Sequence, residues 1–246
     1  VYVASAVLRP KRERLSDDMR GLEALETAIL LSISLAIIFA AIPYIVQNIF
    51  QIEAGLEAKN IAAFLTALAD SLETDFGMTG VQRMYQVPST YFGTFYVRAS
   101  RMAVTITCGN VQQTFYFREL VVGYNSTYVE FGNNMLRGLV GSLAVPIGEP
   151  VVAVNSTYPR TVKLYSRVVY VNGSSSLYLY TISASFVPQG TGQALAYVIG
   201  PLNSTQIQCS GPATVAVSSR YGSASATFNN IKTIYLTWNN VTVMWK

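Results

Sequence analysis

The stretch MRGLEALETAILLSISLAIIFAAIPYIV, residues 19–46, decides the architecture of this chain. It is apolar almost throughout, and it belongs to a run of 26 residues, positions 27–52, that contains no charge. About 20 apolar residues in a helix are enough to cross a bilayer. The sequence therefore predicts a membrane-spanning helix. Its unusual feature is the entrance, where Glu23 and Glu26 follow Gly21.

The helical pattern continues beyond the apolar run, but it becomes amphipathic. Apolar residues recur mainly at spacings of three and four, as expected for one buried helix face: Leu56, Ile61, Leu65, Leu68, Leu72 and Phe76. Charged residues fall mostly elsewhere on the helical wheel: Glu57, Lys59, Asp70, Glu73 and Asp75. The glycines of GMTG, residues 77–80, provide a stop. We predict one long helix over residues 22–76, preceded by a polar leader over residues 1–21.

Within this helix, Pro43 is the expected point of irregularity. Proline lacks the backbone N–H that the helical ladder uses, and its ring crowds the preceding turn. We therefore expect the helix to be kinked or locally unwound at Pro43.

Residues 77–246 have the composition of an all-β domain. Segments rich in Val, Thr, Tyr and Ile alternate with Gly, Asn, Pro and Ser. The predicted strands are GTFYVRAS, MAVTITC, QTFYFREL, TVKLYSRVVYVNG, SLYLYTISASF, ATVAVSSRY and KTIYLTWNNVTVMW. We predict a β-sandwich or a partly closed barrel, and thus an α+β fold with a long N-terminal helix and an all-β, sandwich-like head.

Charge is distributed unevenly and indicates an orientation. Residues 1–21 carry five Lys/Arg and three Asp/Glu, residues 22–77 carry one Lys and seven acids, and residues 78–246 carry eleven Lys/Arg and three Glu. Basic flanks stay on the cytoplasmic side of a membrane, so the head is expected outside. The basic residues of the head are scattered through strand-like segments rather than clustered. Nucleic acid is therefore not expected as the primary ligand.

The residue types argue against catalysis. The chain has no histidine, which is the usual general base near neutral pH and the commonest metal ligand. The head contains no Asp and only Glu119, Glu130 and Glu149, which is a poor supply for a carboxylate metal cage. We expect no enzymatic activity, no metal and no cofactor.

Cysteines and sequons agree with an extracytoplasmic head. Cys108 and Cys209 could be two unrelated buried thiols, but an oxidising location favours a disulfide. Such a bridge would contribute at most about 4–5 kcal/mol in the chain-entropy view. Five N-x-S/T sequons lie on the expected outer side, and we predict surface glycosylation among them: Asn125, Asn155, Asn172, Asn203 and Asn240.

The run RG-LEALETAILLSISLAIIFAAIPYIV resembles the N-terminus of type IV pilins, in the archaeal form that carries a class III signal peptide. The resemblance implies that a prepilin peptidase cuts between Gly21 and Leu22. Glu26 then becomes the fifth residue, where many type IV pilins have glutamate, and Pro43 the twenty-second, where many bacterial pilins have a helix-kinking proline. A long helix followed by a β-rich head with one cysteine pair also resembles the architecture of the family.

Physical chemistry gives Glu26 a role in this reading. Cleavage would create a free amine at Leu22 inside or beside an apolar bundle, where an unpaired charge costs several kcal/mol. The Glu26 carboxylate would provide the counter-charge, within the subunit or to a neighbour. The expected function is then a subunit of an adhesive surface filament, inserted in the cytoplasmic membrane as a precursor. The expected partners are identical subunits, a prepilin peptidase and an assembly platform.

An uncut membrane anchor is the alternative. A secretory signal peptide has its cleavage site after the apolar core, whereas here an amphipathic helix follows that core. In an uncut chain, Glu23 and Glu26 would be interfacial residues stabilised by the dipole at a helix N-terminus. The head would then bind a surface layer or serve as an accessory of an archaellum or pilus.

Overall fold

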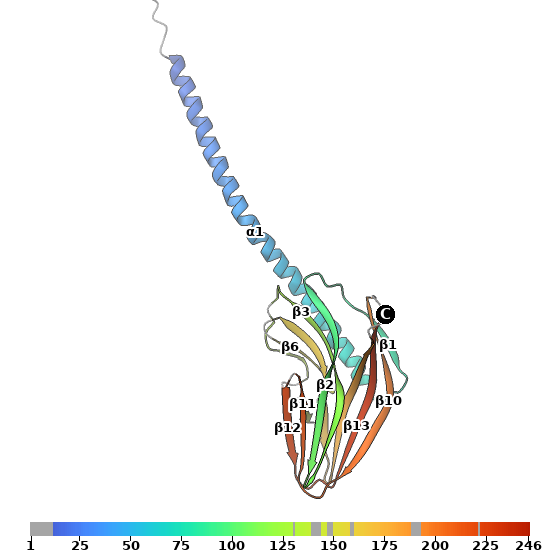
Figure 1. Cartoon of the computed structure of the whole chain (residues 1–246). Helices are drawn as coiled ribbons and strands as arrows, with labels where there is room; N and C mark the ends of the chain where they lie inside the picture. Colours follow the sequence, from blue (N-terminus) through green and yellow to red (C-terminus); the bar gives the residue numbers. More distant parts are fainter. Residues whose placement is uncertain are drawn as a thin grey trace, which may run out of the picture. The chain divides into compact units, whose positions relative to one another are not determined.

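The computed structural model describes residues 12–129, 131–138, 144–146, 150–157, 160–187, 193–220 and 222–246. It consists of one long helix followed by a mostly β domain (Figure 1). The predicted α+β class is therefore confirmed. The chain divides into two compact units, with the boundary between Phe50 and Gln51.

Helix α1 extends over Arg12–Thr74, a length of 63 residues. It begins before the predicted start, so the described part of the predicted leader is also helical. It ends close to the predicted stop, where Gly77 and Gly80 adopt positive φ angles of 86° and 88° that favour glycine. Pro43 lies inside the helix, which continues on both sides without an interruption. The expected local unwinding is absent, because proline removes one hydrogen bond and the flanking residues maintain the rest.

Thirteen strands form two sheets within the described residues. The first has the order β1-β10-β13-β9-β8-β5. Its strands are β1 Gln82–Gln86, β10 Ala194–Gln208, β13 Thr233–Trp245, β9 Ser176–Val187, β8 Val168–Asn172 and β5 Ala144–Pro146. The second has the order β12-β11-β2-β3-β7-β6-β4. Its strands are β12 Gly222–Phe228, β11 Ala213–Ser219, β2 Gly93–Cys108, β3 Val111–Ser126, β7 Thr161–Ser166, β6 Val152–Thr157 and β4 Met135–Arg137. The pairs β13–β9 and β5–β8 are parallel, and the other neighbouring strands of both sheets are antiparallel.

The longest strand that the sequence did not predict is β10. Its sequence, ALAYVIGPLNSTQIQ, contains a Gly-Pro pair and a polar second half, which are both typical of loops. The structure accommodates Gly200 and Pro201 at a shift of register between β10 and β13. A Cβ at Gly200 would approach the carbonyl oxygen of Asn240 to 3.0 Å, so this irregularity also requires a small residue.

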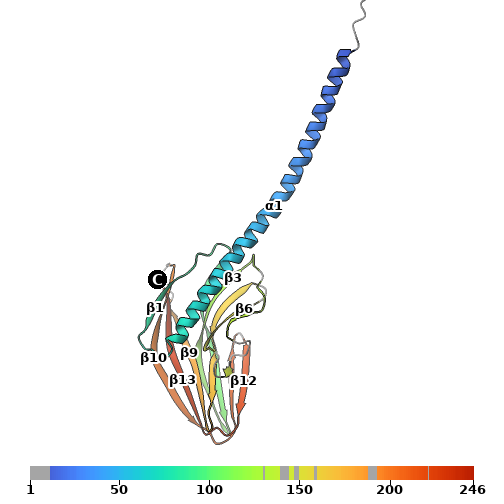
Figure 2. The same ribbon diagram turned by 180° about the vertical axis from the view of Figure 1, so that it is seen from behind.

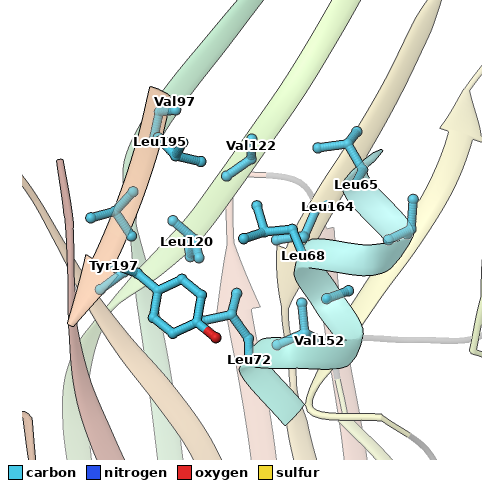
Figure 3. Packing of buried hydrophobic residues seen from close by; sticks show 14 of the residues in the cluster. Leu65, Leu68, Leu72, Val97, Leu120, Val122, Val152, Leu164, Leu195 and Tyr197 are labelled. Carbon is cyan, nitrogen blue, oxygen red and sulfur yellow. The ribbon is translucent and has the colours of Figure 1, made fainter. Parts of the chain in front are cut away.

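The second half of α1 provides the centre of one hydrophobic core, which we call the helix core. Its apolar stripe includes Ala58, Ile61, Leu65, Leu68 and Leu72. Side chains from strands of both sheets surround the stripe, including Val97, Leu120, Val122, Leu195 and Tyr197 (Figure 3). The view from behind shows these last turns of α1 lying against the strands (Figure 2). The amphipathic part of the helix is thus an integral layer of the head.

A second cluster, the distal core, lies between the two sheets without the helix. Met102, Val104 and Val215 come from the second sheet, and Leu179 and Leu236 come from the first. Because both sheets contribute, they pack face to face in this part of the head, as the predicted sandwich requires.

Candidate functional site

The first candidate site is the surface of the charge-free part of α1, residues 27–52. Its large apolar side chains are exposed, and Ile37, Phe39 and Tyr44 are 63%, 69% and 70% exposed. Successive helical residues point about 100° apart, so the exposed residues 37–39 already cover most of the circumference. By length and composition this part of α1 can cross a membrane: its most apolar window has a mean hydropathy of 2.6 and is 0% buried. An exposed apolar surface of this extent is typical of a site that contacts lipid or another protein.

Hydroxyl groups within this part of α1 are compatible with an apolar environment. The Thr27 hydroxyl donates to the carbonyl oxygen of Glu23 at 2.8 Å, and the Ser32 hydroxyl donates to that of Ala28 at 2.7 Å. Both polar groups are therefore satisfied inside the helix and need no water.

The predicted processing site lies within α1, since the backbone is helical at Gly21 and Leu22. Glu23 and Glu26 are exposed. Among the described residues, the Glu26 carboxylate has no hydrogen-bond or ion-pair partner. The roles of Gly21 and Leu22 in processing, and of Glu26 and Pro43 in assembly, therefore stay predictions.

A second constellation, which the sequence did not predict, attaches the amphipathic part of α1 to the head. Glu57 accepts hydrogen bonds from the backbone N–H groups of Tyr91 and Phe92, at 2.6 and 3.1 Å, and from the Tyr124 hydroxyl at 2.6 Å. Burial, together with the neighbouring Glu57, raises the pKa of Tyr124, so this hydroxyl stays protonated and donates. Glu73 similarly accepts from two consecutive backbone N–H groups, those of Val151 and Val152, both at 3.2 Å.

Asp75 completes this set immediately after the helix. Its carboxylate receives two hydrogen bonds from the Arg83 guanidinium, at 2.6 and 2.7 Å, and one from the Tyr197 hydroxyl at 2.6 Å. Asp75 is almost fully buried. Hydrogen bonding from Arg83 is the main cause that lowers the pKa of Asp75, although burial opposes it. We call Glu57, Glu73 and Asp75 the carboxylate clamp.

The sequence did contain a signal for two of these residues. Glu57 lies four positions before Ile61, and Asp75 lies three positions after Leu72, so both continue the spacing of the buried stripe. A carboxylate at such a position is either solvated at the edge of the stripe or hydrogen-bonded to the β head of the same chain. The backbone N–H groups that donate to Glu57 and Glu73 lie in loops and at strand starts, which no sequence periodicity identifies. They belong to residues 91, 92, 151 and 152.

The predicted disulfide is confirmed. Cys108 at the end of β2 is bonded to Cys209, which follows β10, and the two Cα atoms are 5.1 Å apart. Because β2 and β10 belong to different sheets, the bridge ties the sheets together beside the distal core. A disulfide between sites 101 residues apart is typical of proteins that mature in an oxidising compartment.

The five sequons differ in accessibility. Asn125, Asn172 and Asn240 are exposed, whereas Asn155 and Asn203 are half-buried. The Asn155 carbonyl oxygen is fully buried, and the Asn203 amide donates to the carbonyl oxygen of Pro201 at 3.0 Å. The three exposed asparagines are therefore the better glycan acceptors. Their modification stays a prediction.

One buried acid of the head lies outside the clamp. Glu119 is fully buried on β3, and burial raises its pKa to about 7, although the neighbouring Ser219 and the charge of Lys163 lower it in part. Burial lowers the pKa of Lys163. The described residues contain no group of three or more His, Cys, Asp or Glu that could hold a metal ion.

Comparisons with models of protein families, with curated proteins and with solved structures found no match.

Proposed function

We propose that this protein is a structural subunit of an extracellular filament of the type IV pilus kind, in its archaeal form, with a role in attachment to surfaces. In this proposal the charge-free part of α1 lies in the cytoplasmic membrane before assembly. It then packs against the same part of identical subunits in the filament core. The β head, held on the amphipathic part of α1, forms the outer surface.

The observation that supports the proposal best is the contrast within α1. One part is apolar around its circumference and exposed, whereas the next part is built into the head. A filament needs such a division, because its subunits repeat by head-to-tail contacts of one element while the other domain stays folded. A processed subunit also needs a counter-charge for the new amine at Leu22. Glu23 and Glu26, at the start of the apolar part, can provide it.

The alternative is an uncut, membrane-anchored β domain that binds a surface layer or assists an archaellum or pilus. The observation that favours it is the start of α1 at Arg12, because the helix passes through the predicted cleavage site without an interruption. In this form the apolar part would remain in lipid, and Glu26 would lie at the membrane interface.

The N-terminus and intact mass of the protein sheared from cell surfaces decide between the two proposals. A chain that begins at Leu22 and is heavier than its residues by glycan mass supports the filament subunit. A chain that retains Arg20 and Gly21, and that is released only by detergent, supports the anchored domain and contradicts processing.

The variant Gly21→Phe provides a control for this measurement, because a bulky side chain at the scissile bond should block a peptidase that selects small residues there. In the filament proposal the variant should accumulate uncut in the membrane, and sheared material should disappear. Unchanged surface material in the variant would contradict the proposed cleavage.

A further inference from the structure

The outer face of the β2–β3 hairpin carries two arginines at directly paired positions. Arg101 on β2 is opposite Arg118 on β3, and both side chains are exposed. Like charges at paired positions of neighbouring strands destabilise a sheet unless something compensates for them. A third exposed arginine, Arg220, follows Ser219, whose partner on β2 is Met102.

Within the part of the head that the structure describes, no acid compensates for this pair. Among the described residues from 77 onward, Glu119 is the only acidic residue, and it is fully buried. Glu119 also lies on the opposite face of β3, because adjacent residues of a strand point to opposite faces. The described surface of the head around Arg101 and Arg118 is therefore positive without a neighbouring carboxylate.

The two arginines border a hollow. On β2, Arg101 stands between the small residues Ala99 and Ala103, and these alanines pair with Leu120 and Tyr116 on β3. The hollow has a volume of about 430 Å³, and its lining consists of Ala99, Ser100, Arg101, Tyr116, Phe117 and Arg118. We call it the arginine groove.

The groove is held in place by its surroundings. The Arg101 guanidinium lies over the Tyr116 ring at 3.9 Å from its centroid. The backbone N–H of Arg118 donates to the Ser183 hydroxyl of β9 at 3.4 Å. On the same face, the hydroxyls of Thr105 and Thr114 are 3.1 Å apart, and the pair Ala103–Tyr116 lies between them and the arginines. A site fixed in this way loses little conformational freedom when a ligand binds.

We propose that the arginine groove binds an acidic sugar residue of a surface polysaccharide. Two guanidinium groups can hold a carboxylate or a sulfate ester through paired, charge-assisted hydrogen bonds. Tyr116 is 61% exposed, so the aromatic surface that Arg101 leaves uncovered can contact the apolar C–H groups of a sugar ring. The groove bears two arginines rather than a long basic track, so it fits one acidic unit better than the regularly charged backbone of a nucleic acid.

This inference concerns the head alone and holds for a filament subunit and for an anchored domain alike. It is tested with the purified full-length protein in detergent micelles. Binding is measured to immobilised polygalacturonate, which is carboxylated, and to dextran sulfate, which is sulfated. Uncharged dextran and single-stranded DNA are measured at the same salt concentration.

The decisive comparison uses two double variants with the same change in charge. Arg101→Gln with Arg118→Gln should weaken binding to at least one acidic polysaccharide about tenfold or more, because two charge-assisted contacts are lost. Arg160→Gln with Lys232→Gln removes two exposed cations elsewhere on the head and should change binding less than about twofold. Tyr116→Ala should weaken binding to polysaccharide but not to DNA. Equal thermal unfolding midpoints establish that each variant is folded.

Four outcomes would overturn the proposal. Equal losses in the two double variants would show binding through overall charge rather than through the groove. Tighter binding of DNA than of either acidic polysaccharide would assign the surface to nucleic acid. Equal binding of uncharged dextran, or no binding of any probe, would exclude an acidic sugar as the ligand.

Discussion

The two parts of α1 use the same secondary structure for opposite purposes. Residues 27–52 expose apolar side chains around the helix, and their hydroxyls are bonded within it. Residues 54–74 bury one stripe in the helix core and direct carboxylates to donors in the head. The first part leaves its surface for a partner that is not part of the chain, whereas the second part has its partners within the chain.

This difference shows that hydrophobicity alone does not define the role of a helix. In the first part, apolar residues point in all directions, and the largest of them are exposed rather than packed in the head. In the second part, fewer apolar residues contribute more, because strands of both sheets surround them. Substitutions of matched residue types in the two parts therefore have different expected effects. Trp238 and Trp245, both on β13, make fluorescence a probe of the head.

The largest expected effect is a loss of stability of the head, which surrounds residues 54–74 of α1. Replacing Cys108 and Cys209 by serine should lower the free energy of unfolding of the head by up to about 4–5 kcal/mol, because the bridge closes a long loop in the unfolded chain. Urea unfolding in detergent micelles, followed by tryptophan fluorescence, measures this loss. An unchanged midpoint would mean that the bridge contributes nothing to the stability of the head.

Next in size is a matched pair of leucines. Leu68→Ala should destabilise the head by about 2–5 kcal/mol, because Leu68 is buried in the helix core and the substitution leaves a cavity. Leu31→Ala should change the unfolding of the head by less than about 0.5 kcal/mol, since Leu31 is exposed. The same urea titration compares both variants. Similar losses from the two substitutions would contradict the division of α1.

A matched pair of glutamates gives a somewhat smaller effect. Glu57→Ala should cost about 2–3 kcal/mol, because three donors, two of them backbone N–H groups, lose their acceptor. Glu26→Ala should leave the unfolding of the head unchanged but reduce the yield of sheared filaments, with processing intact. Normal filament yield from Glu26→Ala would refute the proposed role in assembly, and an unchanged head in Glu57→Ala would refute the clamp.

The smallest expected effect depends on pH. The pKa of Asp75 is lower in the folded head than the ordinary value of 3.8, mainly because of Arg83. The stability that this carboxylate provides is therefore complete above pH 3.8 and is lost as the pH falls below it. Solvent reaches Arg83, which is 46% exposed, and screens the ion pair, so we expect a small contribution. Unfolding midpoints of Asp75→Asn and the parent chain, measured from pH 6 down to about pH 3, should converge. A constant difference over this range would contradict the assignment.

The sequence predicted the elements that have a strong periodic or compositional signal. The apolar run and the spacing of Leu65, Leu68 and Leu72 identified the helix and its buried face. Segments rich in β-branched and aromatic residues identified β2, β3, β9 and β13, but β10 and β12 were missed because their glycine, proline or small polar residues are typical of turns. For the carboxylate clamp, only the positions of Glu57 and Asp75 had a signal in the sequence, because the donors come from backbone segments far away in the chain. The arginine groove could not be predicted, because it depends on the cross-strand register of β2 and β3.

The position of β13 has a consequence for folding during synthesis, when the N-terminal segments of the chain emerge first. The stripe of α1 is covered in part by Val241 and Val243, and β13 occupies the middle of its sheet between β10 and β9. A chain that emerges from the N-terminal side exposes the amphipathic part of α1 long before these residues arrive. An amphipathic helix without its cover binds to the surface of a bilayer. If the apolar part enters a membrane as proposed, the same membrane can cover the stripe until the head closes over it, and insertion and folding are then coupled through one helix.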